Sequence, residues 1–414
     1  MKLVKLLFKE KTFFKNILIT LVASAFIHFL SYLFNIYLAR NLAEQDFGFY
    51  NAAIGIIYLV QIPTVAIQTA ITKKVAQKRG FNLNKFKLES LLQLGAVGIA
   101  LTLLFILFGK NIADIANIPI QYILPLSIAL FGAVVSPLLK GFLLGLEKIP
   151  HLNLLMLIET VMKFLMAYYS ISKGMDITIP ILANVLPSLL TLAVVFPLVK
   201  TGSSKVPVKR ISIEYKTVVI LFLSFLFLNF SFTLDLILVN PQVRASYGAL
   251  SLIGKIVYFA SITIAGVMIS KLANQKPKQR KKTLVISLIF TALTGLAISA
   301  VFLLFTNQIV DIVFKGMYME IVPYVVMYCI AMTVYAMTYM VINSLLINES
   351  YSHIIFLILL TVLQVALYSI NNSSLNDAVV NQMIIYGMMF VFVITTLIFY
   401  IFKKDEKDKE LVKE

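Results

Sequence analysis

The sequence predicts an all-α integral membrane protein with twelve transmembrane helices in two six-helix lobes. Three observations predict it: an apolar composition, twelve long apolar stretches, and basic residues that alternate between abundant and scarce in the segments between them. The 414 residues are 60% hydrophobic and only 13% charged, and the mean hydropathy is +0.92. A soluble chain of this length could not bury so much apolar surface, whereas a bilayer can solvate it.

Each predicted element is an apolar stretch of about 20 residues, the length that a helix needs to cross the hydrocarbon core of a bilayer. The stretches cover residues 14–39, 48–72, 88–108, 120–146, 151–172, 178–199, 217–239, 246–270, 283–305, 321–347, 353–370 and 382–402. The first one follows several lysines and resembles a signal peptide. Its apolar run continues to Leu38, so we interpret it as an uncleaved first helix.

The basic residues predict the orientation. With the N-terminus inside, the cytoplasmic segments hold 28 Lys and Arg residues and the outer loops hold five. Cytoplasmic segments of membrane proteins carry such an excess. The sequence therefore predicts a multi-pass protein of the cell (inner or plasma) membrane, with both termini in the cytoplasm. The net charge of +17 indicates contact of the cytoplasmic loops with anionic phospholipid, and no binding of nucleic acid.

A polar stretch over 200–216 separates the first six spans from the last six. It predicts an N-terminal lobe over 1–202 and a C-terminal lobe over 203–414 that ends in a short cytoplasmic tail. Six spans return the chain to its starting side, so the lobes would be parallel repeats related by an axis along the membrane normal. Six identities at a constant offset of 197, between 50–77 and 247–274, support this repeat.

Charged residues inside the spans are the first candidate site residues. A charge at the centre of a bilayer costs about 2.5–3.5 kcal/mol on insertion scales, so it usually faces a cavity or a partner. Lys255, in span eight, has no acidic residue at helical spacing on its own helix and is the strongest candidate for contact with a substrate. Glu159 and Lys163 lie four residues apart on one face of span five. They form either a structural ion pair or a charged site that lines a central path.

Other polar residues of the spans have more than one interpretation. Asp235, near the outer end of span seven, is an interfacial carboxylate, a partner for a basic residue of span one or eight, or the carrier of a coupling proton. On span one, His28 is a hydrogen-bonded packing residue or a titrating group, and Asn35 and Arg40 lie further out. Lys140 is expected to extend from the inner end of span four to the membrane interface.

Five prolines fall inside the predicted spans: Pro63, Pro125, Pro137, Pro187 and Pro323. Each removes a backbone donor and is expected to bend its helix. Bent helices suit a protein that alternates between conformations, but static membrane proteins also contain them.

Several functional classes lack their signals in the sequence. It has no Gly-rich phosphate-binding loop that ends in Lys-Ser/Thr, no His/Cys cluster and no repeated channel-filter segment. These absences argue against an ATPase, a metalloenzyme and a channel. The single cysteine, Cys329, cannot form an intrachain disulfide. We expect no metal and no cofactor, and coupling to protons, sodium ions or the membrane potential stays open.

Two segments of the chain resemble a known family. Residues 38–77 begin with Leu-Ala-Arg, continue with Phe-Gly-Phe-Tyr from Phe47, and end an apolar helix with Thr-Lys-Lys. Residues 235–274 contain Asp235, an apolar run, Ser-Tyr-Gly and then Gly-Lys-Ile around Lys255. Both segments resemble the polysaccharide biosynthesis (O-antigen, or lipid-linked oligosaccharide, flippase) family of the multidrug/oligosaccharidyl-lipid/polysaccharide (MOP) exporter superfamily.

The resemblance implies two MATE-like lobes around a central cavity that opens alternately to each side of the membrane. It implies a flippase that moves an isoprenoid-diphosphate-linked glycan to the outer leaflet for polysaccharide biosynthesis, with glycan polymerase machinery as a further candidate partner. It makes Arg40, Asp235 and Lys255 candidate cavity residues, because helices one, two, seven and eight would line the cavity. Many relatives have Phe-Pro before the lysine that ends helix eight, where this chain has Ile269-Ser270.

Two rival functions stay open. A cation-coupled multidrug or small-molecule exporter of the same superfamily would favour acidic cavity residues, whereas Lys255 and Lys163 are cationic. A membrane glycan polymerase or ligase would need a sizeable outer loop, and the longest outer loop spans only 306–320. We therefore expect a transporter and not an enzyme.

Overall fold

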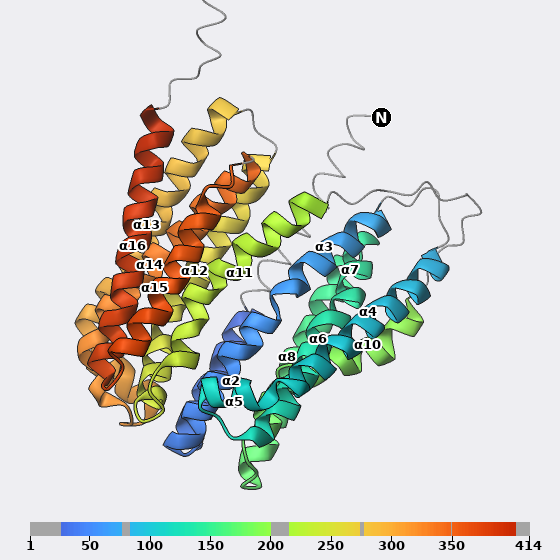
Figure 1. Cartoon of the computed structure of the whole chain (residues 1–414), viewed down its shortest axis with the longest axis horizontal. Helices are drawn as coiled ribbons and strands as arrows, with labels where there is room; N and C mark the ends of the chain where they lie inside the picture. The colour runs from blue at the N-terminus through green and yellow to red at the C-terminus, as the bar shows by residue number, and fades with distance from the viewer. Residues whose placement is uncertain (1–25, 77–82, 200–214, 274–276, 349, 403–414) are drawn as a thin grey trace, which may run out of the picture. The chain divides into compact units, whose positions relative to one another are not determined.

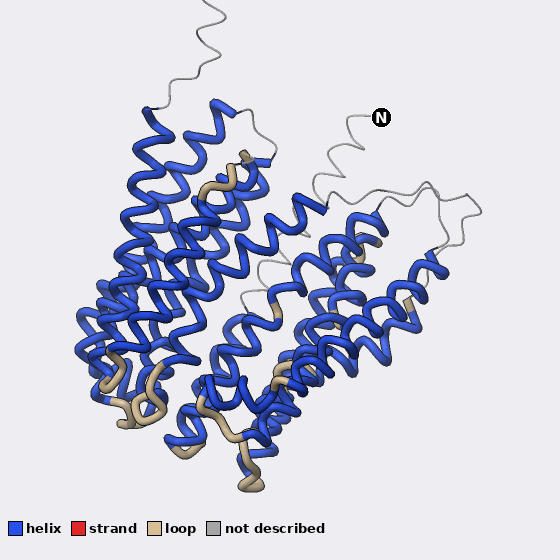
Figure 2. The backbone as a smooth tube through the Cα atoms, in the orientation of Figure 1, coloured by secondary structure: helices blue, strands red, loops and turns tan. Residues whose placement is uncertain are grey.

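The computed structural model describes residues 26–76, 83–199, 215–273, 277–348 and 350–402. Every regular element within these ranges is helical (Figure 2). The chain divides into two compact units, Met1–Phe222 (unit 1) and Leu223–Glu414 (unit 2). The lobe boundary that we predicted at 202/203 lies outside the described residues, so it stays a prediction.

Unit 1 begins, within the described ranges, with a helix over residues 26–41. The following elements, labelled in Figure 1 where there is room, are α2 (Glu44–Val60), α3 (Ile62–Ala76), α4 (Leu83–Leu107), α5 (Gly109–Ala116), η1 (Ile120–Tyr122), α6 (Ile123–Val135), α7 (Pro137–Gly145), α8 (Ile149–Ser172), α9 (Thr178–Leu182) and α10 (Leu186–Leu198). Only one residue separates α2 from α3, and one separates α6 from α7. Each of these pairs is therefore one interrupted span.

Unit 2 contains most of α11 (Tyr215–Leu238), which crosses the division between the units. It continues with α12 (Arg244–Ala273), α13 (Pro277–Phe314), η2 (Met319–Ile321), α14 (Val322–Ile347), α15 (His353–Ile370) and α16 (Leu375–Phe402). Apart from η2, each of these elements has 18 or more residues, whereas several helices of unit 1 are shorter because spans are interrupted there.

Nine helices within the described residues are long and apolar enough to cross a membrane. The chain is therefore a multi-pass membrane protein. The nine agree with nine of the predicted spans. Of the other three, 14–39 lies partly outside the described residues, 178–199 is divided into α9 and α10, and 246–270 lies within α12. The total of twelve spans stays a prediction, as does the orientation, because both termini lie outside the described residues.

The fourth predicted span occupies the same place in each unit. In unit 1 the interrupted helix α6–α7 packs most extensively against α3 and α4. In unit 2, α14 packs most extensively against α12 and α13. In both units the fourth span thus contacts the second and the third, which is the pairing that an internal repeat would produce.

Two glycines allow α7 to lie close to α3. A Cβ atom at Gly141 would come within 2.9 Å of the Gln68 carbonyl oxygen, and one at Gly145 within 2.9 Å of the Thr72 carbonyl oxygen. The two glycines are four residues apart, so they share one helix face. This spacing of small residues lets membrane helices pack backbone against backbone.

Two of the five prolines do not bend a span as predicted. Pro125 and Pro323 stand in the first turns of α6 and α14. The N–H groups of a first turn have no intrahelical acceptor, so a proline there removes no helical hydrogen bond. The other three prolines coincide with interruptions in unit 1, and all three interruptions lie at one cavity.

Candidate functional site

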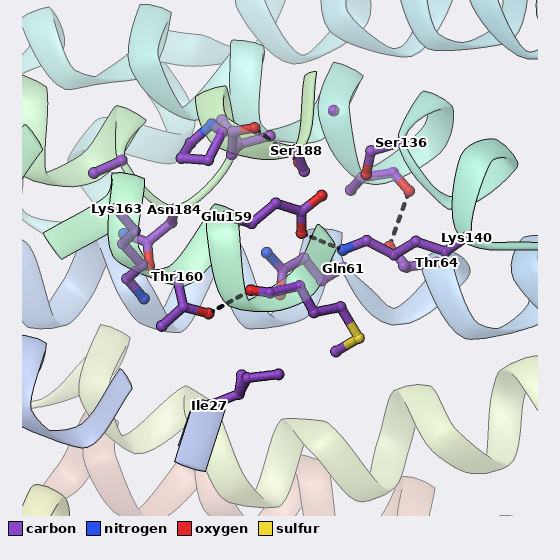
Figure 3. Close-up of a pocket in the computed structure, with 16 residues that line it drawn as sticks. Ile27, Gln61, Thr64, Ser136, Lys140, Glu159, Thr160, Lys163, Asn184 and Ser188 are labelled. Carbon is purple, nitrogen blue, oxygen red and sulfur yellow. Dashed lines mark hydrogen bonds and ion pairs between the residues drawn. The ribbon is translucent and has the colours of Figure 1, made fainter. Parts of the chain in front are cut away.

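Unit 1 contains a polar cavity of about 240 Å³, which we call the unit 1 cavity (Figure 3). Residues of the helix over 26–41, of α3, α6, α7, α8 and α10, and of the interruptions between helices line it. The polar and charged lining residues are Gln61, Thr64, Ser136, Lys140, Glu159, Thr160, Lys163, Asn184 and Ser188. So many polar groups within predicted membrane spans are costly unless they contact one another, water or a ligand.

Three proline interruptions surround the unit 1 cavity. Pro63 follows the break between α2 and α3, Pro137 begins α7, and Pro187 stands in the first turn of α10. A proline inside a helix removes the N–H that would bond to the carbonyl four residues earlier. The residues at the breaks all line the cavity: Gln61, Ser136 and Asn184. The interruptions thus bring polar side chains and main-chain groups to the same place.

Thr64 on α3 replaces the hydrogen bond that is lost at Pro137. In an unbroken helix, residue 137 would donate its N–H to the carbonyl of Ala133. Proline has no such donor, and the Thr64 hydroxyl donates to that carbonyl at 2.9 Å (Figure 3). A neighbouring helix thereby satisfies the freed oxygen, as membrane proteins require.

Glu159 on α8 joins α7 and α10 through its two carboxylate oxygens. Oε2 lies 2.8 Å from the ammonium nitrogen of Lys140, and Oε1 accepts a hydrogen bond from the Thr191 hydroxyl at 2.7 Å. The side chains of Lys140 and Glu159 are only 20% and 12% exposed. Lys140 therefore does not extend to the membrane interface as predicted, because its charge is held by this carboxylate.

Lys163 lies one helical turn beyond Glu159 but does not pair with it. Its ammonium nitrogen lies 4.1 Å from the centre of the Phe34 ring, which belongs to the helix over 26–41. A cation over an aromatic face is attracted by the ring. Figure 3 shows Lys140 and Lys163 on opposite sides of Glu159. Of the two interpretations of Glu159 and Lys163, the structural ion pair between them is wrong, because Lys140 of a neighbouring helix pairs with the carboxylate.

Asn35 belongs to a chain of hydrogen bonds that reaches the cavity lining. The Tyr50 hydroxyl donates to Asn35 Oδ1 at 3.4 Å, and the Asn184 amide donates to the same hydroxyl at 3.5 Å. This chain connects the helix over 26–41, α2 and the interruption between α9 and α10. The other two predicted residues of unit 1 lie outside the cavity lining. Arg40 is half-buried near the end of its helix, and His28 is exposed.

Asp235 on α11 is fully buried in unit 2. Its Oδ2 accepts hydrogen bonds from the hydroxyls of Tyr247 at 2.8 Å and Tyr328 at 3.2 Å. Its Oδ1 accepts the backbone N–H of Leu236 at 2.9 Å. The Tyr368 hydroxyl lies 3.4 Å from that of Tyr247 and extends the group to α15. We call Asp235 and these three tyrosines the Asp235 cluster.

Lys255 on α12 lies beside the Asp235 cluster and is buried, with 5% of its surface exposed. It attracts Asp235 electrostatically, and its ammonium nitrogen lies 4.3 Å from the centre of the Phe232 ring. The preceding residue, Gly254, faces α14 so closely that a Cβ atom would overlap the Tyr328 ring. Among the sequence interpretations of Asp235, a partnership with the basic residue of span eight agrees with this electrostatic attraction.

Sequence reasoning did not select several residues that line the unit 1 cavity or hold its charges: Ser136, Asn184, Ser188 and Thr191. The available signal was the position of a polar residue one to three places before a proline inside a span, which describes Ser136 and Asn184. Thr191 carries no such signal, because its partner Glu159 belongs to another helix.

The chain matches known proteins by its structure and not by its sequence. No family model matches the chain, and no curated protein sequence matches it. Solved structures do match. The structure of the lipid II flippase MurJ in an inward closed conformation has a TM-score of 0.69 and 12% identity, over 92% of this chain and 90% of MurJ. An inward-facing multidrug resistance MATE family transporter of the MOP superfamily has a TM-score of 0.68 and 14% identity, over 91% and 95%.

A third structure is described as a MOP superfamily transporter from Pyrococcus furiosus Vc1 (DSM3638) in which reverse polarity of the binding pocket suggests a different function. It matches with a TM-score of 0.57 and 15% identity, over 93% of this chain and 94% of that one. At these identities the likeness establishes the fold. The chain has the all-helical fold seen in these solved structures, and the resemblance to the O-antigen flippase family stays a prediction.

Proposed function

We propose that this protein is a MOP-type transporter that moves an isoprenoid-diphosphate-linked oligosaccharide from the inner to the outer leaflet of the cell membrane. It would work by alternating access and serve the biosynthesis of a cell-surface polysaccharide or other glycan. The shared fold over more than 90% of the chain supports a transporter. The observation that carries the substrate class is the buried, lysine-containing cavity of unit 1.

The lining of the unit 1 cavity suits an anionic, hydroxyl-rich head group. A glycan cannot cross hydrocarbon unaided, because each polar group without a hydrogen bond costs several kcal/mol. Hydroxyls and amides of the lining could supply replacement hydrogen bonds. Lys163 has no carboxylate partner among the described residues, so its ammonium group can attract a diphosphate, and a charge-assisted contact is stronger in a low dielectric.

The size of the cavity limits what it could hold. At about 240 Å³ it is smaller than the roughly 300–1,000 Å³ of sites that enclose a whole drug-sized ligand. It suits one part of the head group, which we propose to be the diphosphate. The two lysines would then act differently: Lys163 would contact the anion, while Lys140 stays paired with Glu159.

In unit 2 we propose Lys255 as a second anion-contacting residue and Asp235 as the residue that controls it. Proton or sodium binding at Asp235 would neutralise the charge that attracts Lys255 and free the ammonium group for a ligand. In this proposal the coupling ion binds at the Asp235 carboxylate. Protons, sodium ions and the membrane potential remain the candidate driving forces.

Reconstitution of the purified full chain in vesicles tests the proposal. A fluorescent isoprenoid-diphosphate oligosaccharide is placed in one leaflet, and its arrival in the other leaflet is measured by a membrane-impermeant quencher. We expect Lys163→Ala to reduce the transfer rate at least tenfold, whereas Lys85→Ala, a matched change of an exposed lysine in unit 1, leaves it unchanged. Transfer at the normal rate by Lys163→Ala would remove the unit 1 cavity from the mechanism.

A cation-coupled exporter of a cationic drug or other small molecule is the second candidate function, because Glu159 and Asp235 place two carboxylates inside the units. The same vesicles distinguish the two. Extrusion of a cationic dye driven by a proton or sodium gradient, with no transfer of the isoprenoid substrate, would favour the exporter. In that case Glu159→Gln should impair transport more than Lys163→Ala does.

A further inference from the structure

A second and larger cavity of unit 1 lies between α8 and α10, with a volume of about 560 Å³. We call it the α8–α10 groove. Buried Leu143, Leu155 and Val199 lie at its base, while Leu154, Val194 and Leu198 are 57%, 65% and 72% exposed. Its volume is in the range of about 300–1,000 Å³ that is usual for ligand sites. Its lining is almost entirely aliphatic.

The polar exceptions are Thr191 and two basic residues, which lie at the end of the groove where α8 begins. Lys148 precedes the first turn of α8 and His151 lies within that turn. Neither side chain has a hydrogen bond or ion pair with any residue that the structure describes. Glu147 is adjacent in sequence but does not line the groove. The groove thus combines an apolar channel with an ammonium group and an imidazole, both of which can donate hydrogen bonds to an anion.

A second lysine lies near the groove. The ammonium group of Lys87, on α4, donates to the carbonyl oxygens of Pro197 at 3.2 Å and Val199 at 3.1 Å. Val199 belongs to the groove lining, and the distribution of basic residues predicts that this end of the unit faces the cytoplasm.

We propose that the α8–α10 groove binds one anionic phospholipid of the inner leaflet. An acyl chain lies between α8 and α10, and the lipid phosphate contacts Lys148 and His151. The charge of the groove end selects the occupant: anionic lipids supply a phosphate at the cytoplasmic face, and each nearby Lys or Arg strengthens their binding. This inference goes beyond the proposed transport activity, because it concerns a separate cavity and a different face of α8 from the unit 1 cavity.

The groove and the unit 1 cavity share one connection. Ile158 and Met162 line the groove, whereas Glu159 and Lys163 line the cavity. Thr191 also lines the groove, and its hydroxyl donates to Glu159. The acyl chain therefore lies against the residue that holds the Glu159 carboxylate in place.

The composition of the chain offers a direct test, because the protein contains no tryptophan. A single tryptophan at the groove, Leu198→Trp, is compared with Leu103→Trp on α4, a 61% exposed position outside the groove. Each full-length variant is reconstituted with brominated phosphatidylglycerol or brominated phosphatidylcholine, which quench tryptophan on contact. We expect phosphatidylglycerol to be preferred roughly fivefold or more at position 198, and to show no such preference at position 103.

Charge removal then identifies the source of the preference. In the Leu198→Trp background, Lys148→Gln combined with His151→Gln should reduce the preference to the value at position 103. Lys148→Arg should retain it, and Lys85→Gln on α4 should not change it. An unchanged preference after removal of both basic groups, or an equal preference at both tryptophans, would show only non-selective lipid and overturn the proposal. Absence of quenching at position 198 by either lipid would also overturn it, because a protein segment would then cover the groove.

Discussion

Glu159 on α8 pairs with Lys140 on α7 at 2.8 Å, although Lys163 lies only one turn away on its own helix. The carboxylate also accepts the Thr191 hydroxyl at 2.7 Å. Three helices of unit 1 are therefore connected at one carboxylate, and Lys163 is left to the Phe34 ring and to the cavity. Because their partners differ, we expect substitution of Lys140 to affect mainly the stability of unit 1 and substitution of Lys163 to affect mainly transport.

Removal of one member of the Lys140–Glu159 pair should destabilise unit 1 more than removal of both. Lys140→Met leaves a mostly buried carboxylate without its cation, which costs about 3–5 kcal/mol for a fully buried pair and less here, because both side chains are partly exposed. Lys140→Met with Glu159→Met should recover most of the loss, since Thr191 also donates to the Ser188 carbonyl. Thermal unfolding of the purified variants in detergent measures these differences.

The control for this prediction is the exposed pair of Lys85 and Glu89, at 3.7 Å. An exposed ion pair contributes about 0–1 kcal/mol, so the corresponding methionine substitutions should have little effect. The prediction fails if Lys140→Met is as harmless as Lys85→Met.

The hydrogen bond from Thr64 to the Ala133 carbonyl should matter only while proline occupies position 137. Thr64→Val removes the donor at 2.9 Å and should cost about 1–3 kcal/mol, because a buried acceptor loses its partner. In a Pro137→Ala background the new N–H can bond to Ala133, so the same substitution should cost almost nothing. A double-mutant cycle of thermal stability measures this coupling. Equal costs in the two backgrounds would show that the threonine does not replace the missing donor.

Lys255→Ala should abolish transport while the protein still accumulates in the membrane. The change removes the ammonium group that we propose to contact the anion, but Asp235 keeps its hydrogen bonds from Tyr247 and Tyr328. Transfer of the fluorescent substrate and the amount of protein in the membrane are measured together. Lys282→Ala, at an exposed position on α13, serves as the matched control. Normal transfer by Lys255→Ala would exclude this residue from the mechanism.

Gly254→Ala should destabilise unit 2, because the added Cβ atom would overlap the Tyr328 ring and separate α12 from α14. Overpacking of this kind costs about 1–3 kcal/mol. Gly95→Ala on α4 is the opposite case: nothing lies within 4 Å of its Cβ position, and alanine favours a helix over glycine by up to about 1 kcal/mol. The two midpoints of thermal unfolding should therefore move in opposite directions. Equal shifts would mean that the close approach at Gly254 does not constrain the packing.

The membrane spans could be predicted because a bilayer requires long apolar helices, and this requirement is local in sequence. The partners of the charged residues could not be predicted in the same way. Glu159 has a lysine at ideal helical spacing, but the pairing is made with Lys140 because that helix approaches the carboxylate directly. Lys255 has no acidic residue at helical spacing on its own helix, yet it lies beside Asp235 of α11.

The effect of each proline also depended on its position within a helix, which the sequence does not give. Pro137 and Pro187 stand in the first turns of helices that begin in the middle of a predicted span, so they coincide with an interruption, whereas Pro125 and Pro323 stand in first turns near the start of a span. A span that looks continuous from 178 to 199 is divided into α9 and α10, and Asn184, which lies between them, lines the cavity.

The interruption at Pro137 places a main-chain carbonyl at the cavity, and a main-chain group cannot be removed by substitution of its own side chain. The carbonyl oxygen of Ala133 belongs to the main chain, so no side-chain substitution at that residue can delete it. An alanine scan of the lining would remove its partner hydroxyl at Thr64, but not the oxygen itself. Only a change that restores a donor to the helix, such as Pro137→Ala, can occupy that oxygen within the backbone itself.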